Sequence, residues 1–333
     1  MQALLEKLTQ IPGPSGAEHL VRSAVQQEIE GFADAMYTDA LGNLLARKGR
    51  RTDGGLRVMV AAHLDEIGVI VTHVDENGFV RFAPLGGVSP RYAPGGRVRF
   101  LNGVGGVIGL ERTEDRTSAP PLEKMFIDVG AGKRSDCPVA VGDVAVFERP
   151  FEQLGGRWIS KAMDDRVGVA LLIEALKRLG DTPHEVYFVF SAQEEVGVRG
   201  ATTAAFGVEP DLGLAVDVTM TGDTPKGVTM EVALGKGPAV KVKDRGMIAD
   251  PRVVRWMTRT AERSGIPYQR EILEYGSTDG RAIQLSRAGT PTGVLSIPCR
   301  YVHSPSEMVD AGDVKQALDL LLALLSAPIE LGD

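Results

Sequence analysis

Apolar residues recur every three or four positions near the start of the chain, which predicts two amphipathic helices. The segments LLEKL and AEHLVRSAVQQEI have this period, and Pro12, Gly13 and Pro14 separate them. The pattern then changes to RVMVAAHLDEIG, a continuous apolar run of the kind that is buried on both faces of a parallel sheet. The first part of the chain therefore predicts two helices followed by a central strand.

Between residues 68 and 156 the helical period disappears. Alternating Val, Ile and Phe residues extend from VIVTHVDENGFVRF to VGDVAVFERP, and glycine pairs interrupt them at Gly86-Gly87, Gly95-Gly96 and Gly105-Gly106. Short strands at regular spacing with turn residues between them are typical of a small β-barrel or sandwich. We therefore expect residues 68–156 to form an inserted β domain.

From residue 157 onward, strand and helix patterns alternate. Helical periods occur in VGVALLIEALKRLG, PRVVRWMTRTAERSG and DVKQALDLLLALLSA, and apolar strand runs occur in HEVYFVFSA, GLAVDV and TGVLSIP. This alternation predicts an α/β fold with a mostly parallel sheet covered by helices on both faces. We expect residues 1–67 and 157–333 to form one α/β domain that the β domain interrupts.

Composition and charge restrict the possible partners and location. The 333 residues are 43% hydrophobic and 24% charged, with a net charge of −7 and no long basic run, which argues against a nucleic-acid surface. The start, MQALLEKLTQ, carries charges where a signal peptide needs an apolar core, and no apolar stretch is long enough to cross a membrane. Cys137 and Cys299 form no CxxC motif and suit a reducing compartment. We therefore expect a cytoplasmic protein without nucleic-acid or membrane partners.

Acidic and histidine residues follow the predicted strands, where open α/β sheets form their sites. These residues are His63, Asp65 and Glu66 after RVMVAA, Asp164 and Asp165 at a helix start, Glu194 and Glu195 after HEVYFVFSAQ, Asp217 within GLAVDV, and His303 after TGVLSIPCRYV. Each has a structural alternative when taken alone. The Asp164-Asp165 pair can cap its helix, Asp217 can be a turn residue, and either histidine can be a hydrogen-bonded core residue.

The joint pattern favours a metal site over these alternatives. In H-x-D, Asp65 can accept the second N–H of the His63 ring, which is the usual support of a metal-bound histidine. Two imidazoles with three carboxylates suit zinc, cobalt or manganese, and two cations that share a carboxylate would explain the density of acidic groups. The adjacent Glu194 and Glu195 can then have separate tasks, one as a metal ligand and the other as the general base of a hydrolysis.

Six ordered motifs resemble those of the tetrahedral (TET-type) di-metal aminopeptidases, which include glutamyl- and leucyl-aminopeptidase-like enzymes of the co-catalytic zinc exopeptidase clan. The motifs are HLDEIG, KAMDDRVG, SAQEEVGVRGA, AVDV, GSTDG and YVHSPSEM. The resemblance covers essentially the whole chain. It implies a zinc-exopeptidase-like sheet and, at residues 68–156, a PDZ-like β-barrel that serves as a dimerisation domain.

The resemblance also implies a role for each candidate residue. It implies two divalent cations per chain, with the ligands His63, Asp164, Glu195, Asp217 and His303. In this scheme Asp164 bridges the cations and is followed by a cis peptide bond to Asp165. Glu194 is the general base, and Asp65 lies behind His63. Asp279 and Arg281, in GSTDGR, either line the pocket or serve as a helix cap and a solvated charge.

The function implied is removal of N-terminal residues from short peptides by a homo-oligomer whose dimers assemble into a tetrahedral dodecamer. A metal-dependent deacylase or amidase of the same clan is a second possibility. A glycosidase, which also uses two carboxylates, is a third. The histidines and the aromatic content of only 5% argue against the glycosidase. The sequence leaves open which N-terminal side chain is preferred, and Arg281 would favour acidic ones if it faces the pocket.

Overall fold

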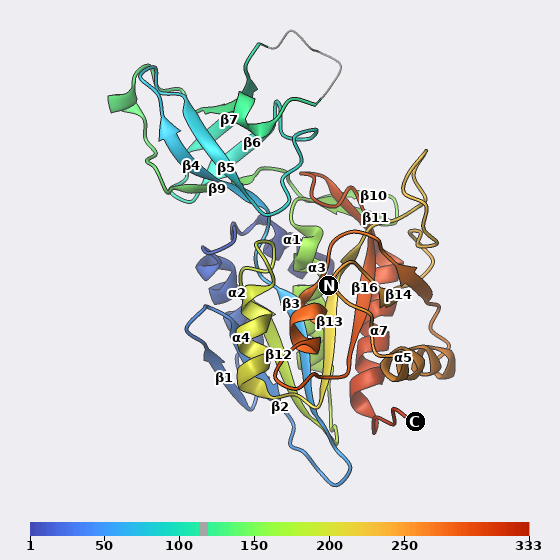
Figure 1. Ribbon diagram of the computed structural model, residues 1–333. Coiled ribbons are helices and arrows are strands. Elements are labelled where there is room, and N and C mark those ends of the chain that lie inside the picture. Colours follow the sequence, from blue (N-terminus) through green and yellow to red (C-terminus); the bar gives the residue numbers. More distant parts are fainter. Residues whose placement is uncertain (113–118, 333) are drawn as a thin grey trace.

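The computed structural model describes residues 1–112 and 119–332. A large α/β body carries both described ends of the chain, and a smaller β-barrel projects from it (Figure 1). Within the described residues, no helix is both long and apolar enough to cross a membrane. The cytoplasmic location expected from the sequence stays a prediction.

The α/β body is built on one sheet with the order β1-β2-β12-β3-β13-β16-β17-β11-β10. Its four neighbouring central strands are mutually parallel: β12 (Glu185–Ser191), β3 (Arg57–His63), β13 (Leu212–Thr219) and β16 (Thr292–Arg300). Antiparallel strands extend both sides: β1 (Ala35–Thr38) and β2 (Leu44–Lys48) on one, and β17 (Glu307–Asp310), β11 (Arg157–Ser160) and β10 (Glu152–Leu154) on the other. Off this path, β14 (Ala239–Lys243) pairs with β16 and with β15 (Gln269–Ile272).

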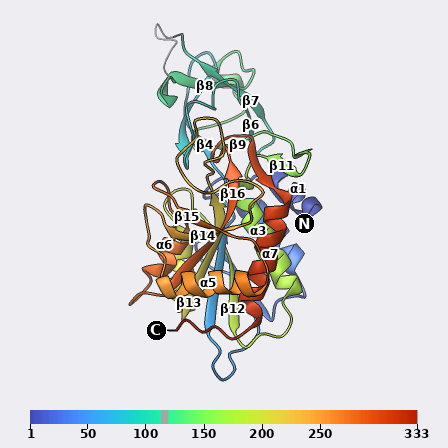
Figure 2. The same ribbon diagram turned by 90° about the vertical axis from the view of Figure 1, so that its right-hand side faces the viewer.

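Helices cover both faces of this sheet because its central strands are apolar on both. In β3, Val58 and Val60 pack into the larger core, while Met59 and Ala61 pack into a smaller core on the other face. The larger core also receives residues of α1 (Gln2–Gln10), α2 (His19–Ile29), α3 (Met163–Arg178), α5 (Pro251–Arg263) and α7 (Ala311–Ser326). The smaller core receives residues of α4 (Arg199–Val208) and α6 (Asp279–Gln284). Figure 2 shows α5 and α7 together on the side of the body that faces the viewer.

The barrel is closed by six strands in the order β4-β5-β8-β7-β6-β9. These strands are β4 (Gly68–Val74), β5 (Val80–Leu85), β6 (Arg97–Phe100), β7 (Gly105–Leu110), β8 (Met125–Asp128) and β9 (Val144–Phe147), with short 3₁₀ turns at Leu122–Lys124 and Arg134–Asp136. Alternate residues such as Val69, Val71 and Val80 fill its own hydrophobic core. Each described strand pairs with two neighbours, although β5 and β8 meet only at Val80 and Ile127.

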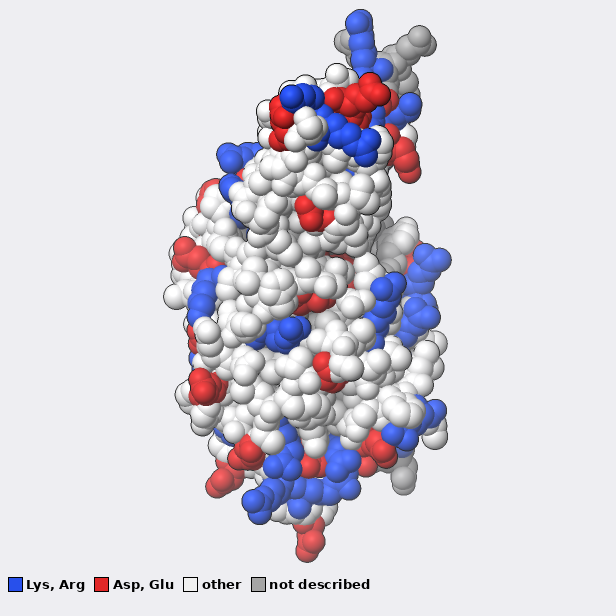
Figure 3. All heavy atoms as spheres, turned by 90° about the vertical axis from the view of Figure 1, so that its left-hand side faces the viewer, with Lys and Arg blue, Asp and Glu red and all other residues white. Residues whose placement is uncertain are grey.

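Charged side chains of both signs are interspersed on the face shown in Figure 3. Lys and Arg gather at the end of the α/β body that lies opposite the barrel. On that face, neither positive nor negative side chains form one continuous patch from the α/β body to the barrel.

Candidate active site

The candidate residues from distant parts of the sequence meet at the carboxyl edge of the central strands. His63 is the last residue of β3, Asp217 lies near the end of β13, and Glu194 and Glu195 follow β12. All of them border one cleft of about 490 Å³, together with Asp164 from the start of α3 and His303 from the segment after β16. Parallel strands end at the same edge, which is why side chains far apart in sequence converge here.

Two groups of possible metal ligands share Asp164. The first group is His63, Asp164 and Asp217, and the second is Asp164, Glu195 and His303, with the ligand atoms of each group within 4.8 Å of one another. Nε2 of His63 lies 3.0 Å from Oδ1 of Asp164, whereas Nε2 of His303 lies 3.3 Å from Oδ2. The two oxygens of one carboxylate thus face two different histidines, as a bridging ligand requires. The peptide bond from Asp164 to Asp165 is cis, as the resemblance implied.

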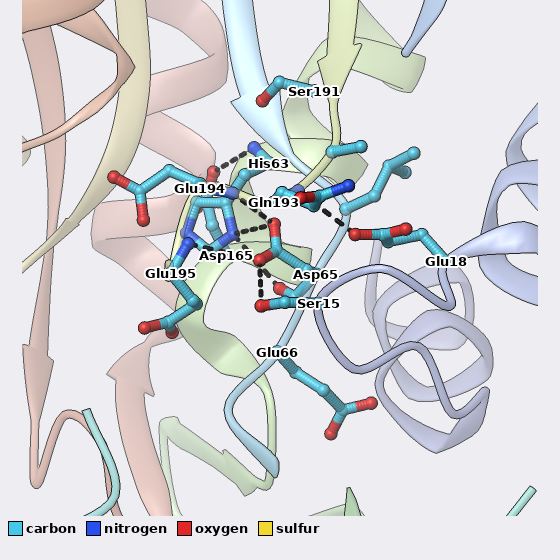
Figure 4. A network of polar contacts seen from close by, with 12 residues as sticks. Ser15, Glu18, His63, Asp65, Glu66, Asp165, Ser191, Gln193, Glu194 and Glu195 are labelled. Atoms are coloured by element: carbon cyan, nitrogen blue, oxygen red, sulfur yellow. Dashed lines mark hydrogen bonds and ion pairs between the residues drawn. The ribbon is translucent and has the colours of Figure 1, made fainter. Parts of the chain in front are cut away.

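Asp65 connects His63 to the glutamate pair. Nδ1 of His63 lies 3.0 Å from the main-chain oxygen of Asp65 and 3.5 Å from its carboxylate, so the ring nitrogen is closer to the carbonyl than to the side chain. The buried carboxylate of Asp65 instead accepts hydrogen bonds from the main-chain N–H groups of Glu194 (2.9 Å) and Glu195 (3.1 Å) and from the Ser15 hydroxyl (2.6 Å) (Figure 4). One residue therefore fixes both the imidazole and the turn that carries the two glutamates.

The side chains of Glu194 and Glu195 diverge from adjacent main-chain positions (Figure 4). Oε2 of Glu195 lies 3.3 Å from Nε2 of His303, which places this residue in the second ligand group. Glu194 borders the same cleft but belongs to neither ligand group. The two adjacent carboxylates thus have different surroundings. Glu195 can bind a cation, and Glu194 is available for another role at the cleft.

The electrostatics of the site call for added positive charge. Burial raises the pKa of Glu194 and of Asp217 well above the ordinary value, and it also raises the pKa of Glu195. Burial alone would lower the pKa of His303, but Glu195 and Asp164 outweigh it and raise that pKa to about 12. The imidazolium thus supplies the charge that a cation would otherwise supply, and metal binding would release its proton.

The donor set fits divalent cations. Each group combines one imidazole with two carboxylates, the ligands that zinc and similar ions take in hydrolases. Oε1 of Glu195 is buried and has no hydrogen-bond partner among the described residues, although a buried polar atom normally has one. A cation at the second group would satisfy that oxygen.

Three further residues support the site and were not identified from the sequence. Glu307, on β17, accepts hydrogen bonds from the main-chain N–H groups of Asp164 (3.0 Å) and His303 (2.8 Å), so it joins the shared carboxylate to the second imidazole. Lys241, on β14, is buried at the cleft and pairs with Glu271 at 2.5 Å. Glu307 stands inside the motif YVHSPSEM, but no sequence spacing indicates its partners.

Asp279 and Arg281 occupy different surroundings. Asp279 is buried, accepts a hydrogen bond from the Ser191 hydroxyl, and has its pKa raised to about 6, chiefly by burial. The cap of α6 is the hydroxyl of Thr278, which accepts from Gly280, so Asp279 does not have the capping role that the sequence allowed. Arg281 is exposed and lines the cleft.

Comparison with known proteins gives one consistent family. Residues 42–320 match the M42 glutamyl aminopeptidase family. The chain is 48% identical to a putative aminopeptidase of Acetivibrio thermocellus, over 96% of this chain and 96% of that protein. Among solved structures, it is similar to an aminopeptidase of the archaeon Desulfurococcus kamchatkensis (TM-score 0.94, 39% identity, 98% of this chain and 94% of that one). It is also similar to the TET1 peptidase of Pyrococcus horikoshii (TM-score 0.86, 34% identity, 97% of this chain and 98% of that one), which can assemble into a tetrahedron or a large octahedral shell.

Proposed function

This chain belongs to the M42 glutamyl aminopeptidase family and is an aminopeptidase, and we propose that it releases N-terminal residues from short peptides with two divalent cations at the sheet edge. One observation carries the proposal. Asp164 belongs to both ligand groups, while Glu194 borders the same cleft and belongs to neither. A shared carboxylate with a separate carboxylate beside it is the arrangement that two-metal hydrolysis needs.

We assign His63, Asp164 and Asp217 to one cation and Asp164, Glu195 and His303 to the other. The ions are zinc in this proposal, and cobalt and manganese suit the same donors. When bound, two such ions polarise the scissile carbonyl and lower the pKa of a water molecule towards 7.

The chain's own residues move the proton and orient the groups. Glu194 accepts a proton from the attacking water and delivers it to the leaving amine, which is the work of a general base followed by a general acid. Asp65 keeps Glu194 in place through the hydrogen bond from the Glu194 main chain (2.9 Å). The acidic lining of the cleft also favours the positive α-amine that distinguishes the substrate of an aminopeptidase.

We also propose separate roles for the α/β body and the barrel. Residues 1–67 and 157–333 belong to the catalytic domain, and strands β4 to β9 within residues 68–156 form a PDZ-like barrel that mediates dimerisation. Strand β10 (Glu152–Leu154) lies in the same stretch of chain but extends the sheet of the α/β body, so the barrel domain ends before it. The similarity to the TET1 peptidase supports further assembly of the dimers into a tetrahedral dodecamer, whose enclosed sites would admit only short peptides.

The test is release of a free amino acid from amide-linked chromogenic aminoacyl substrates, before and after exhaustive chelation. We expect close to two ions per chain, loss of activity on chelation, and recovery with zinc, cobalt or manganese. Acylated amino acids and cello-oligosaccharides serve as competing substrates for the deacylase and glycosidase alternatives. Full peptidase activity in protein that has verifiably lost its metal would refute the two-cation proposal. Faster turnover of an N-acyl substrate than of any free-amine substrate would favour the deacylase.

A further inference from the structure

The inserted barrel reaches the cleft at Gly87, the second of two consecutive glycines. Strand β5 ends at Leu85, and Gly86 and Gly87 follow it directly. Gly87 is part of the cleft lining, beside His303 and Glu195. The barrel therefore supplies one wall of a site whose ligands all come from the α/β body.

Gly87 lies against the ring of His303. A Cβ atom at position 87 would lie 2.2 Å from Nδ1 and 2.6 Å from Cε1 of that ring, distances that real Cβ atoms do not adopt. The imidazole therefore occupies the space that any larger residue would fill. Only glycine at this position allows His303 to reach Asp164 and Glu195 from its present place.

Gly86 lies in the same way against Glu195, the other residue that joins Asp164 in the second ligand group. Its φ is +77°, and a Cβ atom there would lie 2.8 Å from Oε2 and 3.0 Å from Cβ of Glu195. Two consecutive glycines of the barrel thus contact the two residues that join Asp164 in the second group.

The two histidines differ in how their second ring nitrogen is held. Nδ1 of His63 has the main-chain oxygen of Asp65 at 3.0 Å. Nδ1 of His303 makes no hydrogen bond to any described residue and faces Gly87 instead. A metal-bound histidine usually has a hydrogen-bond partner on its other nitrogen that fixes the ring. For His303, the packing of Gly87 takes the place of that partner.

We propose that Gly86-Gly87 is a positioning element for the second cation, through which the barrel fixes His303 and Glu195 in their binding positions. The inference rests on the proposed two-cation function. It predicts that the two cation sites respond differently to a change in the barrel. The site of His63 and Asp217 should be unaffected, whereas the site of His303 and Glu195 should weaken when position 87 gains a methyl group.

Gly87→Ala tests this, with Gly132→Ala as the matched control. Gly132 is a barrel glycine without a positive φ, and a Cβ atom there would have no neighbour within 4 Å. Metal-free protein is titrated with zinc and with cobalt, and bound metal, thermal midpoint and the cobalt absorption spectrum are followed. We expect Gly87→Ala to bind one ion with native affinity and the second about 10- to 100-fold more weakly, as when a group that orients a ligand is lost. The cobalt bands of only one site should change.

The metal-free proteins separate positioning from a contribution to folding. In the metal-free protein the imidazolium of His303 pairs with Asp164 and Glu195, so moving the ring lowers the midpoint of metal-free Gly87→Ala by the loss of these ion pairs. Added metal should then raise it less, since stabilisation by a ligand falls with its affinity. An equal drop with and without metal would overturn the proposal, and so would two native affinities in Gly87→Ala. If the unmodified protein itself binds fewer than two ions, the proposed function fails instead.

Discussion

Glu194 and Glu195 differ in their relation to the cations, so the same substitution at each should have different consequences. Glu194→Gln keeps the shape of the side chain and removes its ability to take a proton. A general base contributes about 10²- to 10⁴-fold to a rate, or about 3–5 kcal/mol of activation free energy. Because Glu194 is outside both ligand groups, and its hydrogen bond to Asp65 uses the main chain, we expect kcat to fall by this factor with both ions retained.

Glu195→Gln should instead lower the occupancy of the second cation site. The change removes the charge of one of the two carboxylates in the second ligand group. Loss of a group that merely orients a ligand already lowers metal affinity by about 10- to 100-fold, so we expect at least this loss for a ligand itself. We therefore expect loss of metal on dialysis, with part of the rate restored by excess metal.

The assay pairs metal content by mass spectrometry with kcat and KM on a leucyl and a glutamyl chromogenic substrate. The assignment is reversed if Glu194→Gln loses metal while Glu195→Gln keeps both ions and loses turnover. Unchanged turnover in both variants would show that neither carboxylate takes part in the reaction, and the mechanism proposed above would fail.

Two further predictions concern assembly and acid stability. The metal-loaded protein should be an oligomer, most simply of twelve chains, by light scattering, and the mass of a single chain for active protein would contradict the role proposed for the barrel. The Asp223–Arg300 ion pair lowers the pKa of Asp223 from 3.8 to about 2, so Asp223→Asn should cost about 1–2 kcal/mol of unfolding free energy at pH 7 after allowance for solvent screening. Because a lowered carboxyl pKa stabilises the folded state above the unfolded-state pKa, this difference should shrink as the pH falls from about 4 to 2, as urea unfolding can measure. A difference that does not change over this pH range would refute that assignment.

The central part of the fold could be predicted because its signals are local. VMVAA (58–62) and VYFVF (186–190) are apolar or aromatic at every position, and the structure buries both faces of β3 and β12. The sequence does not reveal helix α4, because Val208 is the only large side chain among its buried residues and the others are Gly200, Ala201, Ala204 and Ala205, which give no strong hydrophobic period. The short strands β10, β11 and β17 were missed because their pairing joins segments far apart in the chain, which a local pattern does not encode.

The same distinction applies to the site. His63 and Glu194 stand at the ends of strands that the sequence reveals, so their convergence followed from the rule for parallel sheets. Glu307 acts through hydrogen bonds to the main chain of Asp164 and His303. Such contacts depend on how β17 is placed beside β16, and the residue types alone do not predict them.

The glycine pairs of the barrel show most clearly where sequence reasoning ends. Gly86-Gly87, Gly95-Gly96 and Gly105-Gly106 look alike in the sequence, which predicts turn residues of a β domain at all three. In the structure the second pair has ordinary turn surroundings, and Gly106 approaches only barrel side chains and backbone. The first pair alone approaches ligand residues of the α/β body. The sequence shows the same residue whether glycine is required by the backbone of a turn or by a side chain of another domain that packs against it. Only the arrangement of the two domains distinguishes these two requirements.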